Sequence, residues 1–239
     1  MNGADALCDT LLAGGIDTSF ANPGTSEMHF VAALDRKPRM RCVLGLFEGV
    51  VTGAADGYAR MADRPAATLL HLGPGLANGL ANLHNLKRAY SPVVNIVGDH
   101  ATYHLKYDAR LTSDIESLAK PMSHWVKTTS SADSVSADAA EAINVACSAP
   151  GRVATLILPA DVAWDPVATP LAQIQSPSAR NPVSPDRLRA AADAIRSGKR
   201  TALMLSGVAL GAGPLELAGR IAKATAAAGW TALRWRSRT

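Results

Sequence analysis

Short apolar runs that alternate with helical patterns are the feature that most constrains the fold. Strong runs lie at 41–47, 66–72, 92–97 and 153–158, and a shorter extended segment lies at 18–21. Strands that are apolar on both faces belong to parallel sheets covered on both sides by helices. Helical periodicity falls between the runs, at about 6–13, 25–34, 48–61, 77–90 and 133–147. The pattern predicts a doubly wound, mostly parallel α/β domain with helices on both faces, ending near Trp164.

The chain beyond residue 165 has a different character. Five prolines lie between residues 166 and 185, with no sustained periodicity, which predicts a linker over 166–183. After it we expect a helix from Pro185 to about Ser197, a strand at 201–205 and a helix at 214–228. A single strand has no partner for its backbone groups. We therefore expect residues 184–239 to form an incomplete second α/β domain.

Composition excludes several classes of protein. The chain is 48% hydrophobic and 18% charged, as expected of an ordinary globular protein. The net charge of +4 is modest, and the one dense basic stretch is at Arg234, Arg236 and Arg238. No basic stripe with interleaved aromatic residues runs along the sequence, so we predict no nucleic-acid partner. The N-terminus does not resemble a signal peptide and no apolar run approaches 18 residues. These features predict a cytoplasmic protein without a membrane segment.

The three cysteines, Cys8, Cys42 and Cys147, are far apart and lack metal-ligand spacing. We expect them to be buried free thiols in a reducing compartment.

Four polar, glycine-rich motifs follow the first four predicted strands, where doubly wound sheets bind ligands. They are NPGT at 22–25, Glu48, HLGPG at 71–75 and GDH at 98–100. Each also has a simple structural explanation: a capped turn, a carboxylate that stabilises a helix start, a core histidine with a tight turn, and a surface pair formed by His100 and His104.

Other chemistries lack their motifs. The GPG segment matches neither GxGxxG nor a P-loop, and no third ligand accompanies the two histidines convincingly. The sequence also lacks GxSxG and HExxH. Glu48 stands out because it lies in the apolar run LFEGVV, where an unpaired carboxylate would cost several kcal/mol or take up a proton.

Five stretches, taken together and in order, resemble a known family. They are GGIDTSFANPGTSE, FEGVVTGAADGYAR, LLHLGPGLANGLANL, SPVVNIVGDH and GRVATLILPADVAWD. Over residues 1–165 the chain resembles the N-terminal pyrimidine-binding domain of thiamine-diphosphate-dependent enzymes. The likeness is greatest to the group of acetolactate synthase, benzoylformate decarboxylase and pyruvate decarboxylase.

This resemblance implies roles for particular residues. Glu48 occupies the position of the glutamate that hydrogen-bonds the aminopyrimidine N1' and so promotes loss of the proton from the thiazolium C2. The same resemblance implies that Pro23, Gly24 and Asn78 contact the cofactor. Thr25 and His71 would lie on the side of the substrate, a 2-keto acid.

Two features of the resemblance bear on the reaction. The histidine at position 71, before the glycine turn, resembles the decarboxylase branch of the family, in which a histidine at this place serves proton transfer. The segment SPVVNIVGDHATYH is more similar to acetolactate synthase large subunits. We therefore predict acetolactate-synthase-like decarboxylation and carboligation of pyruvate-type substrates. A benzoylformate-decarboxylase-like enzyme and a non-catalytic remnant or binding module are the alternatives.

The resemblance also implies what this chain lacks. Family members are more than twice as long and bind Mg²⁺ and the diphosphate through a GDG motif in a third domain, and no GDG is present here. Residues 184–239 resemble only the start of the family's middle domain, and the ending TALRWRSRT is typical of a truncation or a fragment. We thus expect no bound FAD. Because the family's active site forms between two chains, we expect a homo-oligomer or a complementary diphosphate-domain chain as partner.

Overall fold

The computed structural model describes residues 1–175, 182–225 and 227–231, in two compact units that comprise residues 1–178 and 179–239. Residues 176–181, in the middle of the predicted linker, and the basic stretch at Arg234, Arg236 and Arg238 lie outside the described residues.

The first unit is built on a six-stranded sheet in which every strand pairs in parallel with its neighbours, in the order β2-β1-β3-β4-β6-β5. Its strands are β1 Thr18–Asn22, β2 Arg41–Leu44, β3 Ala66–Leu70, β4 Val93–Asp99, β5 Trp125–Thr128 and β6 Val153–Pro159. Strands β3, β4 and β6 are buried over their whole length. This burial explains their continuous apolar sequences.

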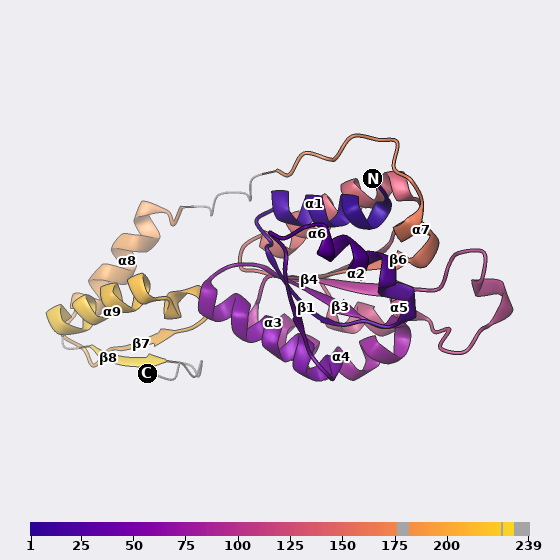
Figure 1. Cartoon of the computed structure of the whole chain (residues 1–239). Coiled ribbons are helices and arrows are strands. Elements are labelled where there is room, and N and C mark those ends of the chain that lie inside the picture. The colour runs from indigo at the N-terminus through magenta and orange to yellow at the C-terminus, as the bar shows by residue number, and fades with distance from the viewer. Residues whose placement is uncertain (176–181, 226, 232–239) are drawn as a thin grey trace. The chain divides into compact units, whose positions relative to one another are not determined.

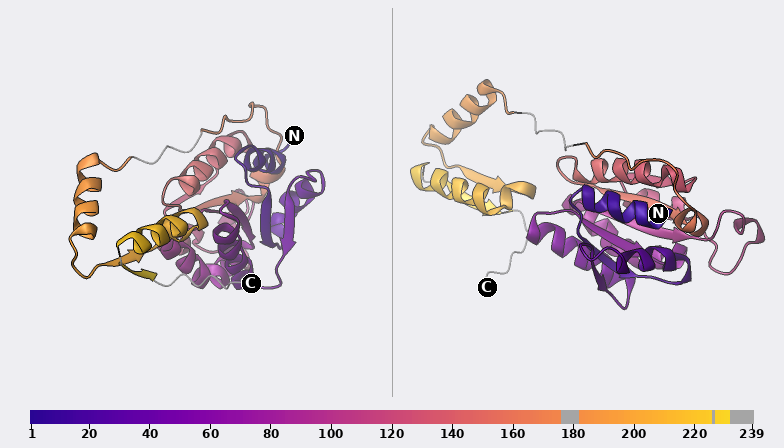
Figure 2. Two further views of the ribbon diagram at one scale, coloured as in Figure 1. Left: turned by 90° about the vertical axis from the view of Figure 1, so that its left-hand side faces the viewer. Right: turned by 45° about the horizontal axis from the view of Figure 1, so that its top comes forward.

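Helices cover both faces of this sheet (Figure 1). One face carries α1 Gly3–Ala13, α2 Met28–Asp35, α6 Val135–Cys147 and α7 Ala160–Trp164, and the other carries α3 Glu48–Ala62, α4 Leu72–Ala89 and α5 Ile115–Ala119. The views in Figure 2 show the same layers, with the indigo α1 and the rose α6 on one side of the strands. In β4, Val94 and Ile96 join the first core, whereas Val93 and Val97 join the second. The predicted doubly wound fold is confirmed.

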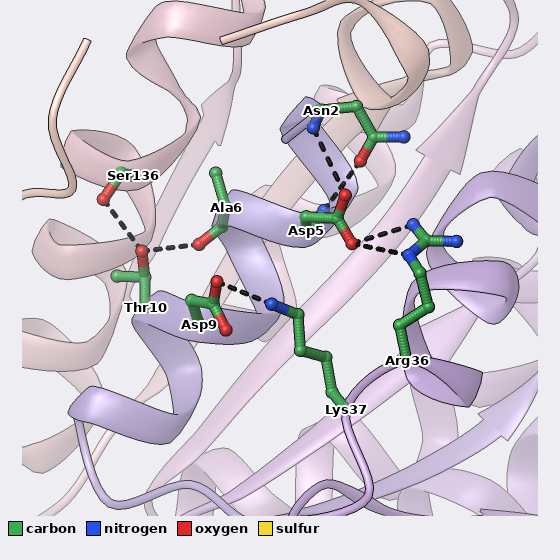
Figure 3. A network of polar contacts seen from close by, with 8 residues as sticks. All are labelled: Asn2, Asp5, Ala6, Asp9, Thr10, Arg36, Lys37 and Ser136. Carbon is green, nitrogen blue, oxygen red and sulfur yellow. Dashed lines mark hydrogen bonds and ion pairs between the residues drawn. The ribbon is translucent and has the colours of Figure 1, made fainter.

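Charged side chains join α1 to α2 (Figure 3). Arg36 donates from Nε and Nη2 to Oδ1 of Asp5, at 3.1 and 2.8 Å. Lys37 pairs with Asp9 at 2.7 Å. Asp5 also forms a capping box with Asn2, since the side chain of each accepts the backbone N–H of the other. Burial would raise the pKa of Asp5, but its hydrogen bonds to Arg36 and to the Asn2 backbone lower that pKa below its usual range.

Several predicted boundaries differ from the structure. The strand expected over 41–47 ends at Leu44, and the helix expected from Ala77 begins at Leu72. Gly73, Pro74 and Gly75 therefore form the first turn of α4 and not a separate turn, because a proline is tolerated there, where its missing N–H would lack a helical partner. Strand β5 and the short α5 were not predicted. Strand β5 lies at the sheet edge and is only half-buried, so its apolar signal is weak.

The second unit contains α8 Pro185–Arg196, β7 Ala202–Leu205, α9 Ala212–Thr225 and β8 Ala228–Thr231. The expectation of a single strand was wrong, because β7 pairs in parallel with β8 from Ala202 opposite Ala228. The predicted helix over 214–228 ends at Thr225, and its last predicted residue, Ala228, instead begins the strand that pairs with β7. Two parallel strands must be joined by a crossover connection, and α9 lies in that connection. Pairing with β7 overrides the helix preference of the alanine-rich segment.

The cysteine prediction needs one correction. Cys8 is buried and Cys147 is half-buried, but Cys42 is exposed on the edge strand β2. All three are free thiols. Among the described residues, no helix is long and apolar enough to cross a membrane.

Candidate active site

The four predicted motifs lie at one edge of the sheet. Strands β2, β1, β3 and β4 are consecutive neighbours and run in parallel, so the segments that follow them emerge side by side. The strand order reverses at β1, which has β2 on one side and β3 on the other. Ligands of doubly wound sheets bind at such a reversal, outside the carboxyl ends of the strands. The structure thus brings NPGT, Glu48, HLGPG and GDH to the edge where a ligand site is expected.

Glu48 is the first residue of α3 and is 6% exposed. Its Oε2 accepts a hydrogen bond from Nδ2 of Asn78 on α4, at 3.0 Å. Its Oε1 has no hydrogen-bond partner among the described residues. A Cβ added at Gly75 would lie 3.0 Å from this Oε1, so a larger residue at that position would crowd the oxygen. The helix N-terminus favours the negative charge of Glu48, and one carboxylate oxygen stays available to a ligand.

Close packing of α3 on α4 fixes the position of Glu48. The Thr52 hydroxyl donates to the Gly79 carbonyl on α4 at 3.2 Å, and Nδ2 of Asn82 on α4 donates to the Gly49 carbonyl at 2.6 Å. A Cβ at Gly79 would lie 3.1 Å from Cγ2 of Thr52, which is tighter than most van der Waals contacts. The start of α3 is therefore held against α4 at several points.

His71 lies between β3 and α4, and a strained residue follows it. Leu72 is buried and has φ of 49°, in the left-handed region that non-glycine residues rarely adopt. Nδ1 of His71 lies 2.8 Å from Oε2 of Glu27. Its Nε2 has no partner among the described residues, and the side chain is 23% exposed. A Cβ at Gly24 would overlap the imidazole ring, so the ring packs directly on the backbone of the NPGT turn.

Glu27 is a site residue that the sequence reasoning missed. It ends the 3-10 turn Thr25–Glu27, and its side chain is 1% exposed. Oε2 also accepts the backbone N–H of Gly24 at 2.8 Å, whereas the buried Oε1 has no hydrogen-bond partner. The spacing from Gly24 to Glu27 is that of a capping box. An acid three residues after the NPGT glycine was the signal that could have identified it.

The predicted site residues form two clusters. Glu48 and Asn78 make one, and His71 and Gly24 make the other, which Glu27 joins. Gly75 lies between them, because a Cβ there would be 3.0 Å from Oε1 of Glu48 and 3.2 Å from Cβ of His71.

Two further predicted residues lie beside these clusters. Pro23 is half-buried and Thr25 is exposed, both directly after β1. No hydrogen bond joins either side chain to the clusters within the part of the chain that the structure describes.

The GDH motif contributes a buried acid near Glu27. Burial raises the pKa of Asp99, and the charge of Glu27 adds to this effect, although the hydrogen bond from the His100 N–H to Asp99 at 2.7 Å opposes it. The rings of His100 and His104 lie 5.6 Å apart, and the His100 ring approaches the Arg110 carbonyl. In the ranges the structure describes, no three His, Cys, Asp or Glu side chains are arranged to hold a metal ion.

These features define a doubly wound α/β domain that offers a carboxylate and an imidazole to a ligand at the carboxyl edge of its strands. Residues 1–126 match the family described as thiamine pyrophosphate enzyme, N-terminal TPP binding domain. The chain belongs to this family.

Known proteins that resemble the chain fall in the same family. A protein of Mycobacterium tuberculosis H37Rv, provisionally named acetolactate synthase large subunit IlvX, is 56% identical over 95% of this chain and 43% of its own length. Benzoylformate decarboxylase of Pseudomonas aeruginosa PAO1 is 34% identical over 65% of the chain and 29% of its own length. A solved thiamin diphosphate-dependent enzyme of Mycobacterium smegmatis is 28% identical, with a TM-score of 0.87 over 97% of this chain and 44% of its own. The chain thus spans less than half the length of these relatives.

Proposed function

We propose that residues 1–165 form the pyrimidine-binding part of a thiamine-diphosphate-dependent enzyme that acts on 2-keto acids in an acetolactate-synthase-like reaction. The single observation that carries the proposal is the state of Glu48, which is buried at a helix start with one oxygen held by Asn78 and one free. The 56% identity to the mycobacterial protein named as an acetolactate synthase large subunit supports this branch of the family.

The residues present fit the pyrimidine half of the cofactor. The pyrimidine N1' can share a proton only with a carboxylate oxygen that has no other hydrogen-bond partner. Within the described part of the chain, Oε1 of Glu48 is such an oxygen. A side chain at Gly75 would crowd that oxygen, since its Cβ would lie 3.0 Å away. Pro23, Gly24 and Asn78 would complete the contacts, from the end of β1 and from α4.

When bound, thiamine diphosphate would supply a nucleophilic carbon for the keto-acid carbonyl and a thiazolium ring that takes up the electron pair released with carbon dioxide. Glu48 would share its proton with the pyrimidine N1', and Asn78 would keep the carboxylate oriented through Oε2. His71, with Nε2 unpaired, would face the substrate together with Thr25 and move a proton there. The protein's contribution is thus orientation and proton transfer.

An exposed apolar surface flanks Glu48. Leu46 is 89% exposed and Val50 is 59% exposed, and Leu44 and Phe47 are exposed beside them on the edge strand β2 and at the start of α3. Contiguous exposed apolar surface marks an interaction site. We infer that a second polypeptide covers this surface, either another copy of the protein or a complementary chain that binds Mg²⁺ and the diphosphate. In this proposal residues 166–183 are a linker, residues 184–239 begin a middle domain, and no FAD is bound.

The alternative reaction is that of a 2-keto acid decarboxylase, a lyase and not a transferase. His71 favours it, because an imidazole with a free Nε2 suits protonation of a product carbon, and benzoylformate decarboxylase is among the relatives. A binding module without catalysis is the third possibility. The three predict different products: acetolactate from pyruvate, an aldehyde from a keto acid, or none.

The test is a calorimetric titration of the purified chain with thiamine diphosphate and Mg²⁺, with Glu48→Gln as the matched variant. Consumption of pyruvate and of benzoylformate is then measured with and without cell extract. We expect binding heat that the variant loses, together with pyruvate turnover that extract restores. Glu48-dependent heat without turnover of either acid would support the binding module. The absence of any Glu48-dependent heat would refute the proposal.

A further inference from the structure

We propose that Glu27 is the positioning residue of His71, and that Gly98 on β4 makes the space that lets it act. The contact between Glu27 and His71 joins the segment after β1 to the end of β3, across the reversal of the strand order. The assignment of His71 to the substrate side rests on the proposed function. The positioning itself is a property of the protein without its cofactor.

The Glu27 carboxylate is held on one side only. Oε2 receives the Gly24 N–H and faces Nδ1 of His71, each at 2.8 Å. Oε1 is buried without a hydrogen-bond partner. A buried carboxylate oxygen normally has a hydrogen-bond donor. Because Oε1 of Glu27 has none, packing against the sheet sets its position.

Gly98 provides that packing space. A Cβ at Gly98 would overlap Oε1, Cδ and Cγ of Glu27, so any larger residue in this position of β4 would displace the carboxylate. The φ of Gly98 lies outside the region that strains other residues, so the glycine is needed for space and not for backbone conformation. This gives the glycine of the GDH motif a role that its sequence context did not disclose.

The arrangement fixes which imidazole nitrogen carries the proton. With Glu27 ionised, Nδ1 of His71 must be the donor in this contact, because an ionised carboxylate only accepts hydrogen bonds. In the neutral ring Nε2 is then unprotonated, and it is the nitrogen that has no partner within the described residues. His71 therefore presents an acceptor to the ligand site when neutral and a donor when protonated. Without Glu27 the ring would sample both tautomers.

The test is ¹⁵N NMR of the full chain labelled at histidine, with the His71 signals assigned by their loss in His71→Gln. Glu27→Leu removes the acceptor, whereas Glu27→Gln keeps an acceptor oxygen without the charge. Gly98→Ala displaces the carboxylate. Gly57→Ala on α3 is its control, because a Cβ there meets nothing within 4 Å.

We expect neutral His71 in the wild type to carry its proton on Nδ1 and to keep that proton slow to exchange. Glu27→Leu and Gly98→Ala should both give the tautomer mixture of a free imidazole, whereas Glu27→Gln and Gly57→Ala should keep the Nδ1–H form. A wild-type ring protonated on Nε2 would overturn the proposal, as would no change in Glu27→Leu. If Glu27→Leu fails to fold, comparing the His71 tautomer in Gly98→Ala with that in Gly57→Ala tests the proposal. No cofactor is added, so this outcome is independent of whether the chain binds thiamine diphosphate.

Discussion

Asn78 donates a 3.0 Å hydrogen bond to Oε2 of Glu48 and is the one side-chain donor to that carboxylate within the residues the structure describes. Hydrogen bonds to charged groups contribute about 1.5–3 kcal/mol, and in this one the acceptor Glu48 is buried although Asn78 itself is exposed. We predict that Asn78→Ala lowers the free energy of unfolding by about 1–3 kcal/mol at pH 7, measured by urea denaturation.

Asn85→Ala is the control on the same helix. Asn85 is exposed like Asn78, but its side chain hydrogen-bonds the Asn82 amide and the His84 ring and not a carboxylate, so its loss should change stability by less than about 0.5 kcal/mol. Equal effects of the two substitutions would contradict the role assigned to Asn78.

The contact of Gly24 with the imidazole of His71 predicts coupling between the two positions. Gly24→Ala should cost about 1–3 kcal/mol, because the new methyl group overlaps the ring and the ring must move. In a His71→Ala background the space is empty, and the same substitution should cost less than about 0.5 kcal/mol. Thermal or urea unfolding of the wild type, the two single variants and the double variant gives the coupling energy between positions 24 and 71. Additive effects would show that the ring does not pack on Gly24.

The ion pair of Asp5 with Arg36 predicts a pH-dependent contribution to stability (Figure 3). Burial raises the pKa of Asp5, but the hydrogen bonds from Arg36 and from the Asn2 backbone, together with the charges of Arg36 and Lys37, outweigh burial, so the folded state lowers this pKa. A lowered pKa stabilises the protein above the unfolded pKa of about 4, and that contribution is lost as the pH falls through the folded pKa. Arg36 is half-exposed, so water screens the pair and we expect only about 0.5–1 kcal/mol.

Asp5→Asn should therefore be destabilising at pH 7 and should approach the wild type in stability near the acid end of the titration. Asp186→Asn is the control, because Asp186 and its partner Arg189 are largely exposed. A constant difference between Asp5→Asn and wild type over the whole pH range would mean that the carboxylate charge is not what stabilises this contact.

The parallel sheet, the helix layers and the strand-end positions of Glu48 and His71 could be predicted, because continuous apolar strands and glycine-rich strand ends carry clear sequence signals. Other features could not be predicted in the same way. Pro74 was taken for a turn residue although it lies in the first turn of α4. Strand β8 was hidden in an alanine-rich segment, since tertiary pairing with β7 decides its conformation.

Glu27 shows the limit most clearly. Its importance comes from contacts with Gly24, His71 and Gly98, which lie on three different strand ends. Only the strand order brings these residues together. Local sequence shows an acid after a turn, and its burial and its imidazole partner follow from the fold.

The most direct test of the central claim is saturation-transfer NMR of thiamine with the wild-type chain and with Glu48→Gln. Thiamine carries the pyrimidine without the diphosphate, so the test does not depend on a diphosphate site, and the method detects affinities as weak as about 1 mM, or roughly −4 kcal/mol. We predict saturation of the pyrimidine protons in the wild type, its loss in Glu48→Gln, and its retention in Glu141→Gln, whose carboxylate lies with Lys127 and Trp125. Equal saturation by wild type and Glu48→Gln, or none by either, would contradict the assignment of Glu48 as the pyrimidine-binding acid.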